Sequence, residues 1–146
     1  MPQLTFPVTR AGLAVPVWIG LPGKLTAILL TAGRKIPAPV QVRGLLDTGS
    51  DVTVVASWVL QQLAIPAVTT TSTQTVAGPI TVRLYEISLS ITAPGQPGAP
   101  MLIEPDLLAM ELATVLQDTD VLIGLDVLLK RRLVLDGPAT QFTLFF

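Results

Sequence analysis

Short apolar runs that end at Gly or Pro are the feature that most restricts how this chain can fold. Val, Ile and Thr, which favour strands, recur together with Leu between 11 Gly and 13 Pro, which break helices and favour turns. The pattern predicts an all-β protein with one or two short helices. The expected strands are residues 13–19, 25–31, 40–46, 52–55, 68–76, 81–91, 101–103, 121–123, 133–135 and 142–145.

Two segments have the composition of short helices, residues 57–63 and 125–131. A Pro/Gly-rich loop is expected at 93–100, whereas residues 106–117 fit neither the helical nor the strand period and are open to either a helix or an irregular insertion. With 146 residues the chain has room for one ordinary domain. We therefore expect a single domain over 1–146, in which residues 1–25 form an N-terminal extension or a first strand.

The chain contains no Cys and no His. This composition excludes disulfides, thiol nucleophiles, the usual zinc sites and every catalytic triad with an imidazole base. Any catalysis must therefore use carboxylates and hydroxyls, and we expect neither a metal nor another cofactor.

Charge and hydropathy indicate which partners the chain has. The net charge is −1, and the only tight basic cluster is residues 130–132, so a nucleic acid partner is not expected. The mean hydropathy of +0.65 is high for a monomer in water, which favours apolar surface covered by a second copy.

No segment has the features of a membrane span or of a convincing signal peptide. The apolar run 11–21 is interrupted by Pro16 and follows a single basic residue, Arg10, so a buried strand is the better interpretation. No uninterrupted apolar run reaches the ~18 residues that a spanning helix needs. We expect a cytoplasmic protein.

The most informative segment is Leu-Leu-Asp-Thr-Gly-Ser-Asp-Val-Thr-Val at residues 45–54, an apolar strand that enters a tight turn and leaves as a second strand. The turn carries Asp47, Thr48, Gly49 and Ser50. A carboxylate at this place can accept hydrogen bonds from turn N–H groups and from the Ser50 hydroxyl, which would fix its orientation. On these four residues alone, an ordinary structural turn is an equally good interpretation.

The same segment resembles the active-site signature of the aspartic peptidases. About 75 residues later, Val-Leu-Ile-Gly-Leu-Asp-Val-Leu at 121–128 resembles the second signature of that family. In the family this strand crosses beneath the catalytic loop, and the resemblance assigns supporting roles to Ile123 and Gly124, because a side chain at the Gly would collide with the loop. Taken alone, this second segment would be a buried strand that leads into a helix.

A single Asp-Thr-Gly-Ser in the chain resembles the retropepsin branch, in which two identical chains each contribute one aspartate. The resemblance implies a closed, barrel-like aspartic protease fold that is active as a homodimer, with Asp47 as the catalytic residue. It also implies a flap, a hairpin over the substrate, formed by residues 68–76 and 80–91 with its tip near 77–79. The substrate-binding residues of such a flap would be Val76, Ala77, Gly78, Pro79 and Ile80, although an ordinary surface hairpin would fit the same pattern.

One position departs from the viral members of the family. There, an Arg follows the second-signature Gly and pairs with the acid just beyond the catalytic turn; here that position is Leu125, while the acid, Asp51, is present. Asp51 therefore needs another partner or lies open to substrate. The Gly-Leu-Asp at 124–126 is closer to cellular and bacterial relatives, and Asp126 is also compatible with a helix cap.

The resemblance implies an endopeptidase in which the two Asp47 carboxylates of a dimer share a proton and activate a water molecule. Thr48 would bond across the dimer axis, and the Gly49 backbone and Asp51 would bind the main chain of a peptide with apolar side chains around the cleaved bond. We expect residues 141–146 to join the dimer interface; the alternative is that they complete the core of one subunit. The alternatives are an inactive dimerisation or peptide-binding module of the same fold and a trimeric β-barrel nucleotide hydrolase, whose other motifs are not found.

Overall fold

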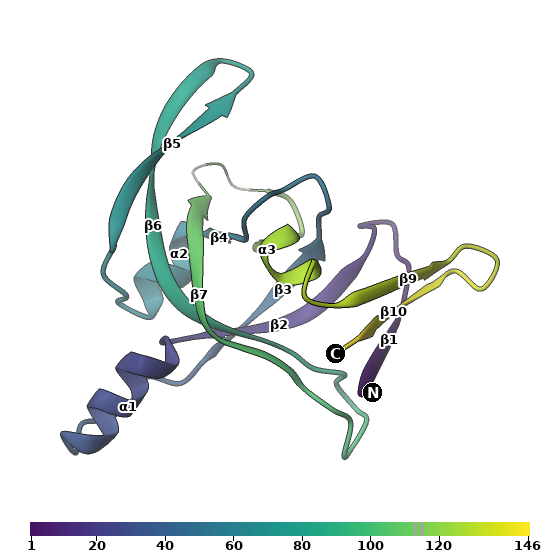
Figure 1. Ribbon diagram of the computed structural model, residues 1–146, viewed down its shortest axis with the longest axis horizontal. Helices are drawn as coiled ribbons and strands as arrows, with labels where there is room; N and C mark the ends of the chain where they lie inside the picture. Colours follow the sequence, from purple (N-terminus) through teal and green to yellow (C-terminus); the bar gives the residue numbers. More distant parts are fainter. Residues whose placement is uncertain (113, 115) are drawn as a thin grey trace.

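The computed structural model describes residues 1–112, 114 and 116–146, which are drawn in Figure 1. It is mostly β, with short helices, as the sequence predicts. In chain order the elements are β1 (Gln3–Pro7), β2 (Ala14–Gly20), α1 (Gly23–Thr31), β3 (Val40–Leu46), β4 (Val54–Ala56), α2 (Ser57–Gln62), β5 (Thr69–Thr75), β6 (Gly78–Ile91), β7 (Leu102–Leu112), β8 (Val121–Ile123), α3 (Leu125–Leu128), β9 (Arg132–Asp136) and β10 (Gln141–Phe145).

Six strands close into a barrel in the order β2-β3-β8-β4-β7-β6, and β6 pairs back onto β2. Along β6 the side chains alternate between buried and more exposed positions, as the pleat of a half-buried strand requires. The inward side chains are aliphatic and fill the barrel; Val17, Ile19, Ile87, Leu89, Ile91, Val121 and Ile123 are completely buried. The closed barrel gives a rigid support for the loops at its ends.

A second sheet contains the first and last strands of the chain, in the order β1-β10-β9 (Figure 1). Its strands are antiparallel, and β10 lies between the other two. Phe142 and Leu144 of β10 are completely buried, and the Phe142 ring packs against Phe6 of β1 with 5.6 Å between centroids. The C-terminal strand therefore completes the core of its own chain, which was the alternative to the place in the dimer interface that we expected. β1 was not predicted as a separate strand, because Pro2 and Pro7 flank its short apolar run.

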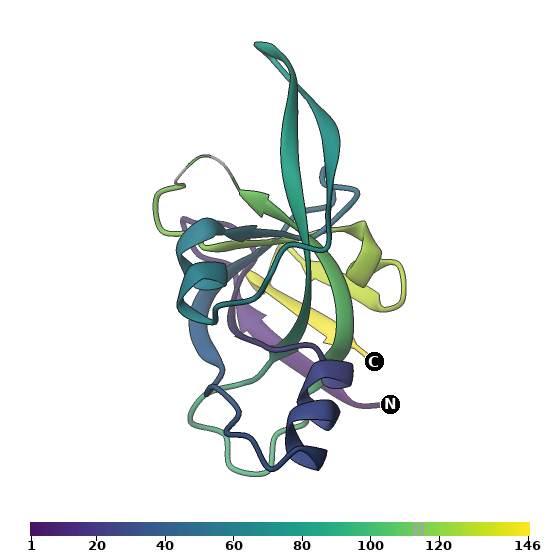
Figure 2. The same ribbon diagram turned by 90° about the vertical axis from the view of Figure 1, so that its left-hand side faces the viewer.

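Two predictions of secondary structure need correction. Residues 25–31, predicted as a strand, form most of α1, because Lys, Leu and Ala are strong helix formers and outweigh the Ile and Thr between them. None of the residues of α1 is buried, and Figures 1 and 2 show the helix standing away from the barrel. The described part of the chain has no helix long and apolar enough to cross a membrane.

The segment left open between helix and irregular insertion, 106–117, belongs largely to a strand. The predicted strand 101–103 is only the beginning of β7, which continues to Leu112 and pairs with both β6 and β4. Ala113 and Val115, within the same segment, lie outside the described residues. Exposed Leu108 among buried neighbours hides the strand period in the sequence.

The hairpin β5–β6 is formed as predicted and extends beyond the barrel (Figures 1 and 2). Its turn is residues 76–77, one residue earlier than the expected tip, and it ends at Gly78, whose φ of 115° is a conformation that only Gly adopts readily. The side chains of β5 are almost all hydroxyls or amides. The hairpin is thus a polar arm attached to the apolar barrel.

Candidate active site

Asp47 follows β3 directly, at the end of the barrel. Its backbone N–H donates to the carbonyl of Ile123 in β8 (2.9 Å), and its own carbonyl accepts from the Ser50 N–H (3.2 Å). One carboxylate oxygen, Oδ1, accepts from the Gly49 N–H at 2.9 Å, so the turn orients this carboxylate as predicted. The expected bond from Ser50 is not formed, because the Ser50 hydroxyl donates to the Val52 carbonyl at 2.6 Å.

Beneath the Asp47 turn, the end of β8 crosses at Gly124. A Cβ on Gly124 would lie 2.6 Å from the carbonyl carbon and oxygen of Val52 and 2.8 Å from the carbonyl oxygen of Ser50. The N–H groups of Leu125 and Asp126 donate to the carbonyls of Ser50 (2.8 Å) and Asp51 (3.1 Å). Because the neighbours are backbone atoms held by these bonds, the crossing requires Gly, as the resemblance implies.

We expect Gly124→Ala to lower the free energy of unfolding by about 3 kcal/mol or more, because backbone atoms on two segments must move to admit one methyl group. Chemical denaturation followed by circular dichroism measures the change. Gly137→Ala is the matched control, since a Cβ there meets nothing within 4 Å and the residue has no positive φ. Equal effects of the two substitutions would contradict the steric argument.

Asp126 and Thr53 join the far side of the loop to α3. The Asp126 carboxylate accepts from the N–H and the hydroxyl of Thr53 (2.9 and 2.8 Å) and from the Val127 N–H (3.0 Å). The Thr53 hydroxyl in turn accepts from the Gly124 N–H (3.2 Å), and Thr53 is completely buried. Asp126 lies in the first turn of α3 but does not cap it, because the N-cap position is Gly124 and has no side-chain cap. Its role is to hold the strand that leaves the loop. A Thr inside the apolar run 52–55 was the available signal for it.

A second carboxylate holds the two strands that lead to the site. Asp120, just before β8, accepts from the backbone N–H and the guanidinium of Arg43 in β3 (2.9 and 3.2 Å). Burial raises the pKa of Asp120, but the hydrogen bonds and charge of Arg43 outweigh burial and keep that pKa below its usual value. Neither residue was predicted to have a role, although Arg43 lies in the predicted strand 40–46 and Asp120 directly precedes the predicted strand 121–123.

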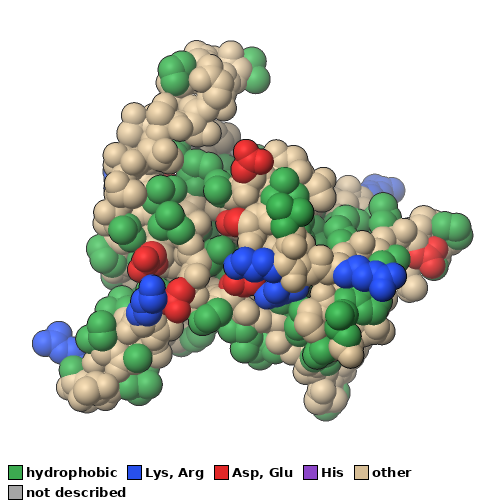
Figure 3. Space-filling model, viewed as in Figure 1, with side chains coloured by type: hydrophobic (Ala, Val, Ile, Leu, Met, Phe, Trp, Pro, Cys, Tyr) green, Lys and Arg blue, Asp and Glu red, His purple; other side chains and the backbone are tan. Residues whose placement is uncertain are grey.

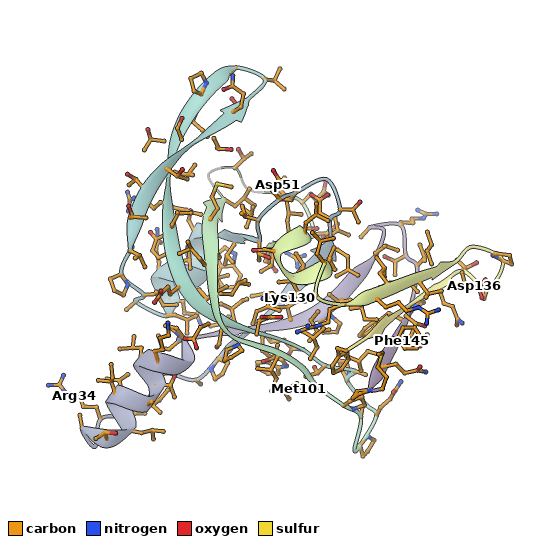
Figure 4. All side chains as sticks on the ribbon, in the orientation of Figure 1. Arg34, Asp51, Met101, Lys130, Asp136 and Phe145 are labelled. Carbon is orange, nitrogen blue, oxygen red and sulfur yellow. The ribbon has the colours of Figure 1, made fainter. Side chains whose placement is uncertain are left out.

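Asp51 is exposed, and its carboxylate forms no ion pair with any residue that the structure describes. Leu125, at the position of the viral Arg, is partly buried. Asp51 lies on the loop on the side where the hairpin β5–β6 stands (Figure 4). On the face seen in Figure 3, basic side chains gather over α1, α3 and β9. Arg83, on β6 of the hairpin, pairs with Glu111 (3.8 Å).

A cleft of about 650 Å³ separates this loop from the hairpin. One wall is residues 49–52, the other is residues 71–74 of β5, and the apolar part is Leu84, Leu108 and Met110. Gly49, Ser50 and Asp51 are thus brought together as predicted, whereas Val76, Ala77, Gly78, Pro79 and Ile80 do not line the cleft. The polar residues 71–74 were missed, and their run of hydroxyl side chains was the only signal. The described residues contain no group of three or more potential metal ligands.

The comparisons with known proteins find similarity among solved structures. No family profile and no curated protein matches the sequence. Among solved structures, the chain is similar to a retropepsin-like aspartic protease from Rickettsia conorii, with a TM-score of 0.58 and 12% sequence identity over 97% of this chain and 89% of that chain. At 12% identity the similarity shows a shared fold. Together with the closed barrel and the Gly124 crossing, it shows that the chain has the retropepsin fold.

Proposed function

We propose that the chain is an aspartic endopeptidase of the retropepsin type, with Asp47 as its catalytic residue. The observation that carries the proposal is the support of the Asp47 turn. The turn's own Gly49 N–H orients the carboxylate, the Ile123 carbonyl fixes the Asp47 backbone, and the Gly124 crossing braces the loop from below. An ordinary turn needs no such support from a distant strand.

The chemistry requires a second carboxylate, and the chain contains one Asp-Thr-Gly-Ser. A second copy of the chain supplies it across a two-fold axis. Exposed apolar side chains at the end of α3 and on β9, such as Leu129 and Leu135, and the unpaired edges of β1 and β9 are available for this contact. Thr48, which is exposed beside Asp47, bonds to its counterpart and keeps the two loops aligned.

In the dimer, one Asp47 carries the shared proton and the other is ionised. The ionised carboxylate removes a proton from a bound water, which attacks the scissile carbonyl carbon. The protonated carboxylate donates a hydrogen bond to the carbonyl oxygen, and a proton then passes to the departing amine as the C–N bond breaks. The residues of this chain supply every group that these steps need.

The substrate lies extended between the Asp47 loop and the hairpin β5–β6, which acts as a flap. The flap tip, residues 76–80, stands away from the loop in the single chain and closes onto the bound peptide in the dimer. The backbones of Gly49 and Asp51 contact the peptide main chain. Leu84, Leu108 and Met110 offer apolar surface to its side chains.

We expect the purified chain to cleave a denatured protein substrate and pepstatin to inhibit this cleavage. The cleavage rate should be highest at mildly acidic pH. Two carboxylates ~3 Å apart do not both ionise easily, so the pair retains one proton in mild acid and loses it as the pH rises. The rate should therefore fall towards alkaline pH, and the specific activity should fall on dilution as the dimer dissociates. A pH–rate profile and a dilution series on the purified chain measure both.

A rate that climbs steadily from neutral into alkaline pH would exclude a carboxylate pair. Constant specific activity at dilutions where sedimentation finds only monomer would exclude a shared site. A folded dimer without turnover on any substrate would instead support the inactive peptide-binding module.

A further inference from the structure

One charge in the cleft has no structural use. The Asp51 backbone is held by the bond from the Asp126 N–H to its carbonyl, so the loop does not need the Asp51 side chain for its shape. The carboxylate is exposed and forms no ion pair with the described residues, and the neighbouring Leu125 offers it no charge. A carboxylate that neither pairs nor shapes the loop is free to bind something else.

The surroundings of Asp51 suit a cation with an aliphatic stem. Across the cleft, residues 71–74 carry hydroxyl and amide oxygens, which accept hydrogen bonds, and none of the described residues that line the cleft is basic. Leu84, Leu108 and Met110 form an apolar wall in the same cleft. A Lys or Arg side chain can lay its methylene stem along apolar surface while its charged end meets a carboxylate. An acidic side chain would be repelled.

We propose that this cleft is a specificity subsite that selects a Lys or Arg side chain of the substrate, with Asp51 as its determinant. The proposal rests on the proposed function of the same site and adds a substrate class to it. Since the two-fold axis of the dimer produces two copies of the cleft, the preference applies at one position on each side of the cleaved bond. Around the bond itself the substrate stays apolar, so the preferred sequence has an apolar centre flanked by basic residues.

The test uses the full chain and a set of peptides that share one cleaved sequence. At each position within about four residues of the cleaved bond, Lys is compared with norleucine, which has the same stem without the charge, and with Glu. We expect Lys to raise kcat/KM about tenfold over norleucine at one position on each side, the factor expected for a charge-assisted hydrogen bond at a partly exposed site. Glu should lower it.

Two variants should remove the preference by different routes. Asp51→Asn deletes the charge, and Leu125→Arg keeps Asp51 but gives it a partner within the chain; each should bring the Lys/norleucine ratio close to one. Asp136→Asn, which removes the same charge from the distant β9–β10 hairpin (Figure 4), should leave the ratio unchanged. Circular dichroism checks the fold of each variant, and Leu125→Arg still decides the question should Asp51→Asn fold poorly.

The outcomes separate the two proposals. Suppose that cleavage depends on Asp47. If the wild type then has a Lys/norleucine ratio near one, or if both variants keep the preference for Lys, the Asp51 subsite is wrong and the peptidase proposal stands. If no peptide is cleaved in an Asp47-dependent way, the peptidase assignment fails and the subsite fails with it.

Discussion

Asp47→Asn should abolish peptide cleavage and leave a folded protein. The substitution removes the ionisable group from both halves of the proposed dyad, and an amide can act neither as the general base nor as the shared acid, so we expect kcat to fall by at least about a thousandfold. The fold should survive because the carboxylate is only partly buried and accepts one hydrogen bond, from the Gly49 N–H, which the Asn carbonyl can also accept. Turnover of one peptide and a denaturation curve measure the two effects.

Ser50→Ala provides the comparison within the same turn. Its hydroxyl donates to the Val52 carbonyl and does not reach the Asp47 carboxylate, so the loss is one local hydrogen bond of about 1 kcal/mol. Its effect on turnover should be far smaller than that of Asp47→Asn. Wild-type turnover in purified Asp47→Asn protein would show that Asp47 is not the catalytic residue.

Removing Leu144, Phe145 and Phe146 should unfold the chain, and Leu144→Ala alone should lower its free energy of unfolding by about 2–5 kcal/mol. Leu144 is completely buried, and its strand pairs with Leu4 of β1 on one side and Leu133 of β9 on the other. Truncation therefore removes the β10 partners of Gln3 and Leu4 in β1 and of Arg132 and Leu133 in β9, and it uncovers the apolar side chains that packed against Leu144. Together these losses should approach the whole free energy of unfolding of a small domain.

Circular dichroism and sedimentation of the truncated chain measure this effect. Leu30→Ala is the control for the point substitution, because Leu30 lies on the outer surface of α1 and is 63% exposed. A truncated chain that remains folded but sediments as a monomer would show that these residues serve a dimer interface instead of the core.

The sequence predicts the parts of the site whose chemistry restricts the residue type. The turn at Asp47 and the Gly124 crossing beneath it were predicted through their resemblance to the two family signatures, and the structure contains both. The catalytic role of Asp47 stays a prediction. Residues 71–74 could not be predicted in this way, because hydroxyl residues in a strand are common and only the tertiary fold brings them opposite Asp51. The pair of Arg43 and Asp120 was missed for the same reason, since its members are 77 residues apart.

The secondary structure shows the same division. Strands with one buried face, such as β6, have buried side chains at every second residue over most of their length. Their period is clear in the sequence, and they were predicted nearly to their ends. α1 was mistaken for a strand because it packs on little else, so no buried face gives its sequence a helical period. In β7 the partly exposed residues near its end depend on pairing with β4, which lies about 55 residues earlier in the chain and leaves no local pattern.

The position of β10 between β1 and β9 also determines when this sheet can form as the chain folds. Thr5 and Thr143, whose hydroxyls lie 2.8 Å apart, are separated by 138 residues. During synthesis β1 therefore waits unpaired until β10 has been made, and a fold with such distant contacts forms slowly. A growing chain therefore cannot complete the sheet that closes its core until β10 has been made.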